Sequence, residues 1–272
     1  MAERILIIRK MSALEYYYKG KHESAKIRES AMNHDRNVKR IARILKKSGR
    51  EFDIVTRHEL SEEFVSGYDT VISAGGDGTV IATAAYNLNT PQLNLKTDIN
   101  SVGALCQEDL PKALKAFLDN RYKIEEWTRQ DVSLDGNFVG RASNETCVGE
   151  LLRFDKLAKY ELIFSDAETG LTERENQGCS GIIIVTGTGS SAWPAAFKPY
   201  SRTESYFRFK TLLQHSGIIE QGKTSYVRIN YKGHEGEFSI DTKEYNLARD
   251  SELEIELSKN PLRVIVPILE EK

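Results

Sequence analysis

The sequence predicts an α/β domain, built on a parallel sheet with flanking helices, followed by a β-rich domain. In residues 4–96, short apolar runs alternate with stretches whose apolar residues recur at helical spacing. This alternation is typical of a parallel sheet with helices packed on it. After about residue 120, strand-like runs follow one another with few helices between them. We therefore expect a first domain at 1–110, onto which the C-terminal tail can pack back, and a second domain at 111–272.

The first domain contains four predicted strands. They cover residues 4–9, 51–55, 68–74 and 92–96. Helices are expected at 33–48, where Val38 and Ile41 belong to an apolar pattern of helical spacing, and in the alanine-rich stretch 79–88. Residues 11–32 are polar and rich in tyrosine, lysine and glutamate, so we expect a loop or partly helical excursion there.

The second domain is predicted to be mostly β. It opens with strands at 126–134 and 138–146 around the turn Asp135-Gly136-Asn137, which is a hairpin signal. Further strands are expected at 160–165, 181–186, 225–231, 237–240, 251–257 and 262–266. A helix is expected at 202–214.

The charge and the hydropathy exclude several classes of protein. With 38 basic and 40 acidic residues the net charge is −2, which gives no electrostatic case for nucleic acid or an anionic membrane. An anionic ligand must therefore be held by a local site. No apolar run approaches the roughly 20 residues of a membrane span, and the start does not resemble a signal peptide. We expect a cytoplasmic protein.

The metal-binding residue types form no motif. The cysteines Cys106, Cys147 and Cys179 are far apart and make no C-x-x-C pair, so neither a disulfide framework nor a structural zinc site is expected. The histidines are His22, His34, His58, His215 and His234. They form no metal-binding cluster, and we expect them at the surface or in loops.

The string Gly75-Gly76-Asp77-Gly78-Thr79 lies between a buried strand and the alanine-rich helix. A strand–turn–helix of this kind places ligands at the carboxyl end of a parallel strand. Glycines let backbone N–H groups approach an anion, and the helix N-terminus adds partial positive charge. The string lacks the endings of the Walker A and G-x-G-x-x-G loops. We predict that its glycines and Thr79 bind phosphate.

Asp77 is the unexpected residue in this turn, because a carboxylate repels phosphate. Its presence makes sense if it holds Mg²⁺ or accepts a proton from an attacking hydroxyl. The alternative is a tight turn in which Asp77 only caps the helix. The full five-residue string favours the catalytic role.

A turn of this composition after a strand resembles the signature shared by NAD kinases, diacylglycerol kinases and sphingosine kinases. Two further segments resemble those of NAD kinases: Asn144-Glu145 and Thr186-Gly187-Thr188-Gly189-Ser190-Ser191-Ala192-Trp193. An acidic residue can take two ribose hydroxyls, and an amide can bind the edge of an adenine. Small residues and hydroxyls can line a site for a large polar ligand, on which an aromatic ring can stack.

Two other stretches resemble the mitochondrial-type NAD kinases of animals. They are Cys179-Ser180-Gly181 and Asn94-Leu95-Lys96-Thr97-Asp98. The typical bacterial enzymes carry an NAD-binding aspartate where Ser180 stands, so that contact must here be replaced or supplied by another chain. Asp98 is either a further polar contact to the ligand or only a carboxylate in the turn at a strand end.

The resemblance implies the two-domain fold of NAD kinases, with the active site between the domains. It implies transfer of the γ-phosphate of ATP, with Mg²⁺, to the 2′-hydroxyl of the adenosine ribose of NAD, giving NADP. Asp77 would then be the catalytic residue. The residues expected to contact NAD are Asn144, Glu145, Thr188, Ser191, Ala192 and Trp193. A homodimer at least is expected by resemblance alone.

Two other functions stay open from the sequence. A lipid kinase using the same turn would need an apolar acceptor groove or a membrane-binding surface, and we find no basic amphipathic helix or exposed apolar stripe in the sequence. A non-catalytic NAD(P)-binding sensor is the second alternative, because Ser180 departs from the family pattern.

Overall fold

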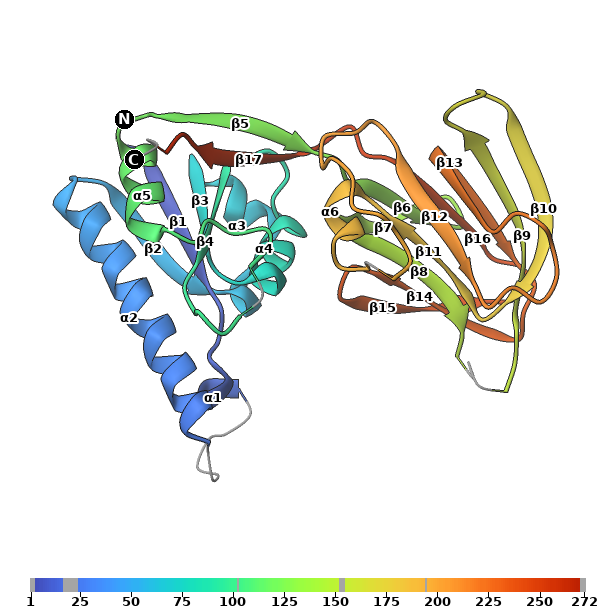
Figure 1. Ribbon diagram of the computed structural model, residues 1–272, viewed down its shortest axis with the longest axis horizontal. Helices are drawn as coiled ribbons and strands as arrows, with labels where there is room; N and C mark the ends of the chain where they lie inside the picture. The colour runs from blue at the N-terminus through green and yellow to red at the C-terminus, as the bar shows by residue number, and fades with distance from the viewer. Residues whose placement is uncertain (1–2, 17–23, 102, 152–154, 194, 270–272) are drawn as a thin grey trace. The chain divides into compact units, whose positions relative to one another are not determined.

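The chain divides into two compact units in the computed structural model, which describes residues 3–16, 24–101, 103–151, 155–193 and 195–269 (Figure 1). The first unit consists of residues 1–126 together with 262–272, and the second of residues 127–261. The division lies after the 110/111 boundary expected from sequence. The difference arises because the helix and the strand that follow residue 109 belong to the first unit.

The first unit is built on a six-stranded sheet in the order β2-β1-β3-β4-β17-β5. Its strands are β1 (Arg4–Arg9), β2 (Glu51–Thr56), β3 (Thr70–Gly75), β4 (Gln92–Lys96), β5 (Tyr122–Trp127) and β17 (Leu262–Pro267). Its helical segments are α1 (Ala13–Tyr16), α2 (Ala25–Lys47), η1 (Arg57–Glu59), α3 (Glu62–Ser66), α4 (Asp77–Ala84) and α5 (Leu110–Leu118). β1 pairs in parallel with β2 and β3, and β4 pairs in parallel with β3 and β17.

Helices cover both faces of this sheet. Apolar residues of α2 and α5 form one buried cluster with side chains of β1, β3 and β4, and Val65 of α3 belongs to a second cluster with the opposite faces of β1 and β3. β3 is buried at every residue, as expected of a strand covered on both sides. The predicted parallel α/β domain is confirmed.

Helix α2 begins before the predicted start at residue 33. The Ser24 hydroxyl accepts a hydrogen bond from the Ile27 N–H and caps the helix at its N-terminus. Ala31 and His34 extend the buried face that Val38 continues. The polar composition of residues 25–32 conceals the helix because only one narrow face there is buried. Residues 17–23 of the expected excursion lie outside the described part of the chain.

The second unit contains an antiparallel sheet of eleven strands. They are β6 (Gln130–Leu134), β7 (Asn137–Ala142), β8 (Glu145–Glu150), β9 (Ala158–Asp166), β10 (Thr172–Cys179), β11 (Gly181–Val185), β12 (Phe207–Leu212), β13 (Gln221–Tyr231), β14 (Glu235–Ile240), β15 (Lys243–Ala248) and β16 (Glu252–Leu257). The main path runs β15-β14-β8-β11-β12-β13-β16-β6-β7, and β9 joins it through β13 and carries β10. The predicted β-rich domain is confirmed.

Two details of the second unit differ from the sequence-based expectation. The helix expected at 202–214 is wrong, because β12 alternates buried and half-buried residues and pairs with β11 and β13. An alternating pattern has the period of a strand. The single strand expected at 126–134 is two strands, β5 and β6, which belong to different sheets.

The C-terminal strand β17 inserts between β4 and β5 of the first sheet. Ile265 is opposite Leu93 in the register and is 1% exposed in the core of the first unit. β17 is therefore part of the α/β core.

We predict that Ile265→Ala lowers the free energy of unfolding of the first unit by about 2–5 kcal/mol, because it leaves a cavity in a packed core. Ile268→Ala is the matched control, since Ile268 is 56% exposed, and it should change stability by less than about 0.5 kcal/mol. Urea unfolding followed by far-UV circular dichroism measures both. Trp193 lies in the second unit, whereas Trp127 ends β5 at the division between the units, so an equal shift of the Trp193 fluorescence transition, followed with Trp127→Phe present in each protein, would contradict this assignment of β17.

Candidate active site

The glycine turn lies where β3 ends and α4 begins. Gly76 is the N-cap of α4, which starts at Asp77 and thus earlier than the predicted residue 79. The N–H groups of Thr79 and Val80 donate to the Gly76 carbonyl, whereas the earlier N–H groups of a first helical turn have no partner within the helix. Gly78 is exposed, and no atom lies within 4 Å of the position a Cβ would take. The geometry suits a phosphate approaching the helix N-terminus.

Gly75 is required by a close contact inside the turn. A Cβ on Gly75 would lie 2.1 Å from the Thr79 hydroxyl oxygen, which is far inside van der Waals contact. Thr79 is 3% exposed, so its side chain packs against the strand end rather than capping the helix. This packing fixes the angle at which α4 leaves β3.

Asp77 is half-buried and does not cap α4. One of its carboxylate oxygens accepts a hydrogen bond of 3.1 Å from the Ala104 N–H and the other accepts one of 2.9 Å from the Leu105 N–H. The carboxylate therefore holds a later loop against the turn. Each carboxylate oxygen has a further lone pair with which to meet a ligand. The alternative in which Asp77 only caps the helix is not what the geometry shows.

Asp98 follows β4 at the same carboxyl edge of the sheet and is 3% exposed. It accepts hydrogen bonds from Lys10 Nζ at 2.7 Å, Ser30 Oγ at 2.5 Å and the Asn100 N–H at 3.0 Å. Burial alone would raise the pKa of this carboxyl, but the bonds from Lys10 and Ser30 outweigh burial and lower it. These hydrogen bonds hold the Asp98 carboxylate within the strand-end turn.

In the second unit, the segments 143–145 and 186–190 lie against one another. β8 and β11 pair with Glu145 opposite Val185. The Thr186 hydroxyl donates to the Ser143 carbonyl at 2.6 Å and accepts from the Gly189 N–H at 3.2 Å, which caps the short helix α6 (Gly187–Ser190). A Cβ on Gly189 would lie 2.2 Å from the Asn144 carbonyl oxygen. Only glycine allows so close an approach, so two motifs distant in sequence form one site.

This site contains buried polar atoms that lack hydrogen-bond partners among the described residues. They are Ser143 Oγ, Asn144 Oδ1, Glu145 Oε2 and Thr188 Oγ1. Half of the unpartnered buried side-chain atoms in the described part of the chain belong to these residues. Buried polar groups without partners are rare because they lose hydration without compensation. Their concentration in one place indicates a polar ligand.

A pocket of about 440 Å³ is lined by three of the predicted residues, Glu145, Ser180 and Trp193, and Glu145 is the one residue with an unpartnered buried atom among its described lining residues. Its other lining residues are Cys147, Val148, Gly149, Gly181, Ile182, Ile183, Leu212, Leu213, Glu237, Phe238, Ser239, Asp241 and Glu244. Ser191 and Ala192 are exposed directly after α6 and do not line it. Apolar walls with a few converging polar groups are typical of a small-molecule site.

Sequence reasoning missed Asp241, which holds the Asn144-Glu145 segment in place. Its carboxylate accepts the N–H groups of Ser143 at 2.9 Å, Asn144 at 2.8 Å and Glu145 at 3.2 Å. Burial raises the pKa of Asp241 to about 6 despite these bonds. Burial and the nearby Asp241 raise the pKa of Glu145 to about 7, against the opposing hydrogen bond of Trp193. The sequence offers only a weak signal, a carboxylate directly after a predicted strand.

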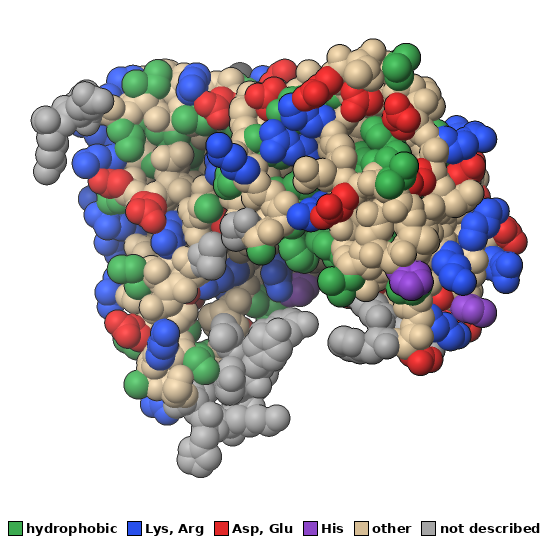
Figure 2. Space-filling model, turned by 45° about the vertical axis from the view of Figure 1, so that its right-hand side comes forward, with side chains coloured by type: hydrophobic (Ala, Val, Ile, Leu, Met, Phe, Trp, Pro, Cys, Tyr) green, Lys and Arg blue, Asp and Glu red, His purple; other side chains and the backbone are tan. Residues whose placement is uncertain are grey.

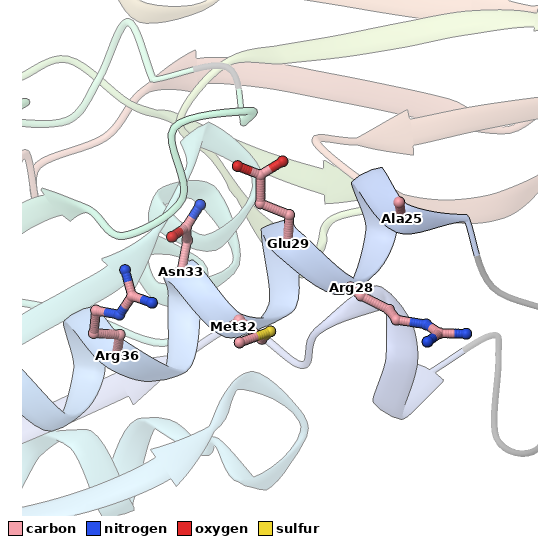
Figure 3. Close-up of a pocket in the computed structure, with 6 residues that line it drawn as sticks. All are labelled: Ala25, Arg28, Glu29, Met32, Asn33 and Arg36. Carbon is pink, nitrogen blue, oxygen red and sulfur yellow. The ribbon is translucent and has the colours of Figure 1, made fainter.

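A second hollow lies on the outer side of α2 and contains none of the predicted residues. Figure 3 shows its lining side chains, all of which come from that one helix: Ala25, Arg28, Glu29, Met32, Asn33 and Arg36. Its volume is about 570 Å³. Among the described residues, this hollow is lined by one helix alone, so they do not converge on a ligand as the groups of the pocket in the second unit do.

Helix α2 is also a basic amphipathic helix, so the expectation that the chain contains none is wrong. Its charged residues are Lys26, Arg28, Arg36, Lys39, Arg40, Arg43, Lys46 and Lys47, against Glu29 and Asp35. Figure 2 shows Lys and Arg side chains along the left-hand edge of the molecule. The helix expected from sequence began only at residue 33, so it left out Lys26 and Arg28, which are part of the basic pattern of α2. None of the described helices is long and apolar enough to cross a membrane.

From the sequence we expect neither a structural zinc site nor a disulfide framework. Within the described residues, no group of three or more His, Cys, Asp and Glu side chains is arranged to hold a metal ion. Cys106, Cys147 and Cys179 are free thiols. Burial, followed by the charge of Asp77, raises the pKa of Cys106 to about 12, which keeps this thiol protonated beside the turn.

The exposed histidines are His58, His215 and His234, and His22 lies outside the described residues.

Solved structures identify the fold. A crystal structure of an NAD kinase from Archaeoglobus fulgidus in complex with ATP superposes with a TM-score of 0.70 at 19% identity, covering 98% of this chain and 94% of that one. The structure of yeast NADH kinase complexed with NADH gives a TM-score of 0.74 at 14% identity, covering 98% and 84%. The fold is the two-domain fold of NAD kinases.

Curated proteins with similar sequences are NAD kinases. No family model matches the chain. The human protein "NAD kinase 2, mitochondrial" is 28% identical over 59% of this chain and 46% of its own length. An NAD kinase of Corynebacterium jeikeium is 30% identical over 51% of this chain and 46% of its own. The chain spans about half the length of the curated relatives it matches. Over about half of its length, the sequence of this chain is therefore similar to those of NAD kinases.

The raised pKa of Glu145 predicts a pH dependence of the second unit's stability. The folded pKa is about 7 and the ordinary value is 4.5, so between these values the folded state holds a proton that the unfolded chain has released. Stability contributed by this proton is present below about pH 4.5 and is lost as the pH rises through about 7.

Glu145→Gln removes this dependence, because glutamine stays neutral. The stability of the original protein relative to the variant should therefore fall between about pH 5 and about pH 8. Urea unfolding followed by tryptophan fluorescence measures the difference, and Asp241 is present in both proteins. A difference that stays constant over this range would show that Glu145 ionises normally.

Proposed function

We propose that this chain is an NAD kinase, which transfers the γ-phosphate of ATP to the 2′-hydroxyl of the adenosine ribose of NAD. The observation that carries the proposal is the group of buried, unpartnered polar atoms at Ser143, Asn144, Glu145 and Thr188. These atoms need a polar ligand with several hydroxyl and amino groups. A dinucleotide has this chemistry, and the glycine turn at the start of α4 supplies the phosphate site that a kinase requires.

In this mechanism the N–H groups at the start of α4 and the open backbone of Gly78 bind the phosphates of ATP. Asp77 orients the 2′-hydroxyl and accepts its proton. The 2′-oxygen forms a bond to the γ-phosphorus, the bond from that phosphorus to the β,γ-bridging oxygen breaks, and ADP leaves. The proton then passes from Asp77 to solvent. Mg²⁺ bound to ATP would neutralise developing charge, and one protein carboxylate such as Asp77 suits its preference for few protein ligands.

The NAD contacts are assigned to the second unit. Glu145 would accept two ribose hydroxyls, the Asn144 amide would bind the adenine edge, and Trp193, which is 38% exposed, would cover the ligand. Thr188, Ser191 and Ala192 would complete the contacts around α6, and Ser180 would contribute from the pocket wall. The ionised form of Glu145 is the better acceptor for ribose hydroxyls, and a bound ligand that donates to it favours ionisation.

The names of the relatives support this choice of substrates. The Archaeoglobus structure contains ATP and the yeast structure contains NADH, which supports ATP as donor and NAD or NADH as acceptor. The relatives do not favour a lipid kinase, although α2 is basic and amphipathic.

A cytoplasmic location stays a prediction, since the human relative is named mitochondrial. We also infer a homodimer at least, which light scattering would contradict with a single peak at 30.8 kDa.

We predict that Asp77→Asn lowers kcat by about 10²- to 10⁴-fold, because the amide cannot accept the proton. NADP formation from NAD, ATP and Mg²⁺, read by an NADP-specific dehydrogenase, measures it. Asp119→Asn is the matched control, since Asp119 is the C-cap residue of α5 and its exposed carboxylate forms an ion pair with Arg121. Calorimetry should show that the Asp77 variant still binds NAD. A kcat within about threefold of the original, with normal circular dichroism, would rule out the catalytic role.

Gly78→Ala tests the phosphate site without disturbing the fold. An added Cβ meets no atom within 4 Å, and alanine favours a helix over glycine. We predict unchanged or slightly higher stability but a KM for ATP raised by about tenfold or more, because the methyl group stands where phosphate approaches. Gly67→Ala, at the C-cap of α3, should leave the KM for ATP unchanged. An unaltered KM in the Gly78 variant would move the phosphate site elsewhere.

A further inference from the structure

His34 is fully buried, contrary to the expectation that the histidines lie at the surface or in loops. It projects from α2 to the carboxyl ends of two strands. Its Nε2 lies 3.0 Å from the Lys10 carbonyl oxygen, directly after β1, and its Nδ1 lies 2.8 Å from the Thr97 hydroxyl oxygen, directly after β4. One side chain thus joins the ends of the two strands that flank β3.

These contacts define the tautomer of the imidazole. A carbonyl oxygen can only accept, so Nε2 must carry the hydrogen and donate to Lys10. Nδ1 is then the acceptor, and the Thr97 hydroxyl donates to it. Burial, and then the positive charge of Lys10, lower the pKa of His34 to about 4. The ring is therefore neutral at ordinary pH, as this pair of hydrogen bonds requires.

The two residues joined by His34 also hold the entrance of the glycine turn. The Lys10 N–H donates to the Ala74 carbonyl at 3.3 Å, and the Thr97 N–H donates to the Gly75 carbonyl at 3.1 Å. Ala74 and Gly75 are the last residues of β3 before Asp77. A fixed distance between Lys10 and Thr97 therefore fixes the position and direction of the backbone from which the turn departs.

Two neighbours of His34 on α2 strengthen the same edge. Ser30 and Asn37 lie four residues before and three residues after it, on one helix face. Ser30 Oγ donates to Asp98, and Asn37 Nδ2 donates to the Thr97 carbonyl at 2.9 Å. The rest of the buried face of α2 is apolar, apart from His34 itself. Polar groups cost stability when buried, so a helix that only covered the sheet would have apolar side chains at this edge too.

We propose that His34 is a positioning residue for the phosphate turn, acting through Lys10 and Thr97 to hold the end of β3 and so to place Asp77. The inference rests on the proposed function for its effect on catalysis. Its structural part, that the imidazole restrains residues 75–79, stands independently of the substrate. His34 touches neither the turn nor a substrate, and its role differs from that of Asp77.

Thr97 allows the sharpest test, because its side chain can be changed without altering its shape. Thr97→Val leaves His34 Nδ1 without a donor, whereas Thr97→Ser keeps the hydroxyl. We expect Thr97→Val to lower kcat by about tenfold or more, with the KM for NAD unchanged, and Thr97→Ser to stay within about threefold of the original. Ile265→Ala is the control for lost stability alone, and well below its unfolding temperature it should keep the original kcat.

Hydrogen exchange measured by mass spectrometry separates this proposal from the proposed function. Amides in peptides that cover residues 75–79 should exchange about tenfold faster or more in Thr97→Val, but not in Thr97→Ser. This result supports the positioning role even if no NADP forms. Unchanged exchange at the turn in Thr97→Val would overturn the proposal. So would faster exchange with an unchanged kcat in an active enzyme, because the turn would then need no such restraint.

Discussion

The parallel pairing of β3 between β1 and β4 is the interaction on which the phosphate turn depends. It brings three strand ends to one edge of the sheet, where the Lys10 N–H donates to the Ala74 carbonyl and the Thr97 N–H donates to the Gly75 carbonyl. At this edge the chain must change direction sharply, and Gly75 allows it by accepting the Thr79 side chain where a Cβ would stand. Backbone N–H groups then face outward at the start of α4. The catalytic proposal for Asp77 has meaning only within this geometry.

In the second unit, too, strand pairing brings together segments that are far apart in the sequence, although these strands are antiparallel. The β8–β11 pairing places two motifs together, Gly189 permits their contact, and Asp241 binds three successive N–H groups to keep the segment rigid. The result is a group of buried polar atoms without partners, which the fold maintains against the cost of desolvation. Proteins retain such groups where a ligand completes them. Burial is the largest cause of the raised pKa of both Glu145 and Asp241, and the charge of Asp241 raises the pKa of Glu145 further.

The sequence was sufficient to predict those features that depend on a short, contiguous pattern of residues. The turn at Gly75–Thr79, the strand before it, and the hairpin around Asp135-Gly136-Asn137 all lie within single contiguous segments. His34 and Asp241 could not be found this way, because their roles come from contacts with residues far along the chain. A polar helix segment does not reveal which of its residues faces the core. The strand β12 was mistaken for a helix because its alternation is short, and the sheet partners that select a strand are not visible locally.

The central claim is that the buried polar site and the glycine turn serve one phosphoryl transfer to NAD. The most direct measurement is an incubation of the purified chain with NAD, ATP and Mg²⁺, in which NADP and ADP are quantified together. The account predicts that both products form in equal amounts. Tight binding of NAD without NADP formation, or ADP formation that does not depend on NAD, would contradict it.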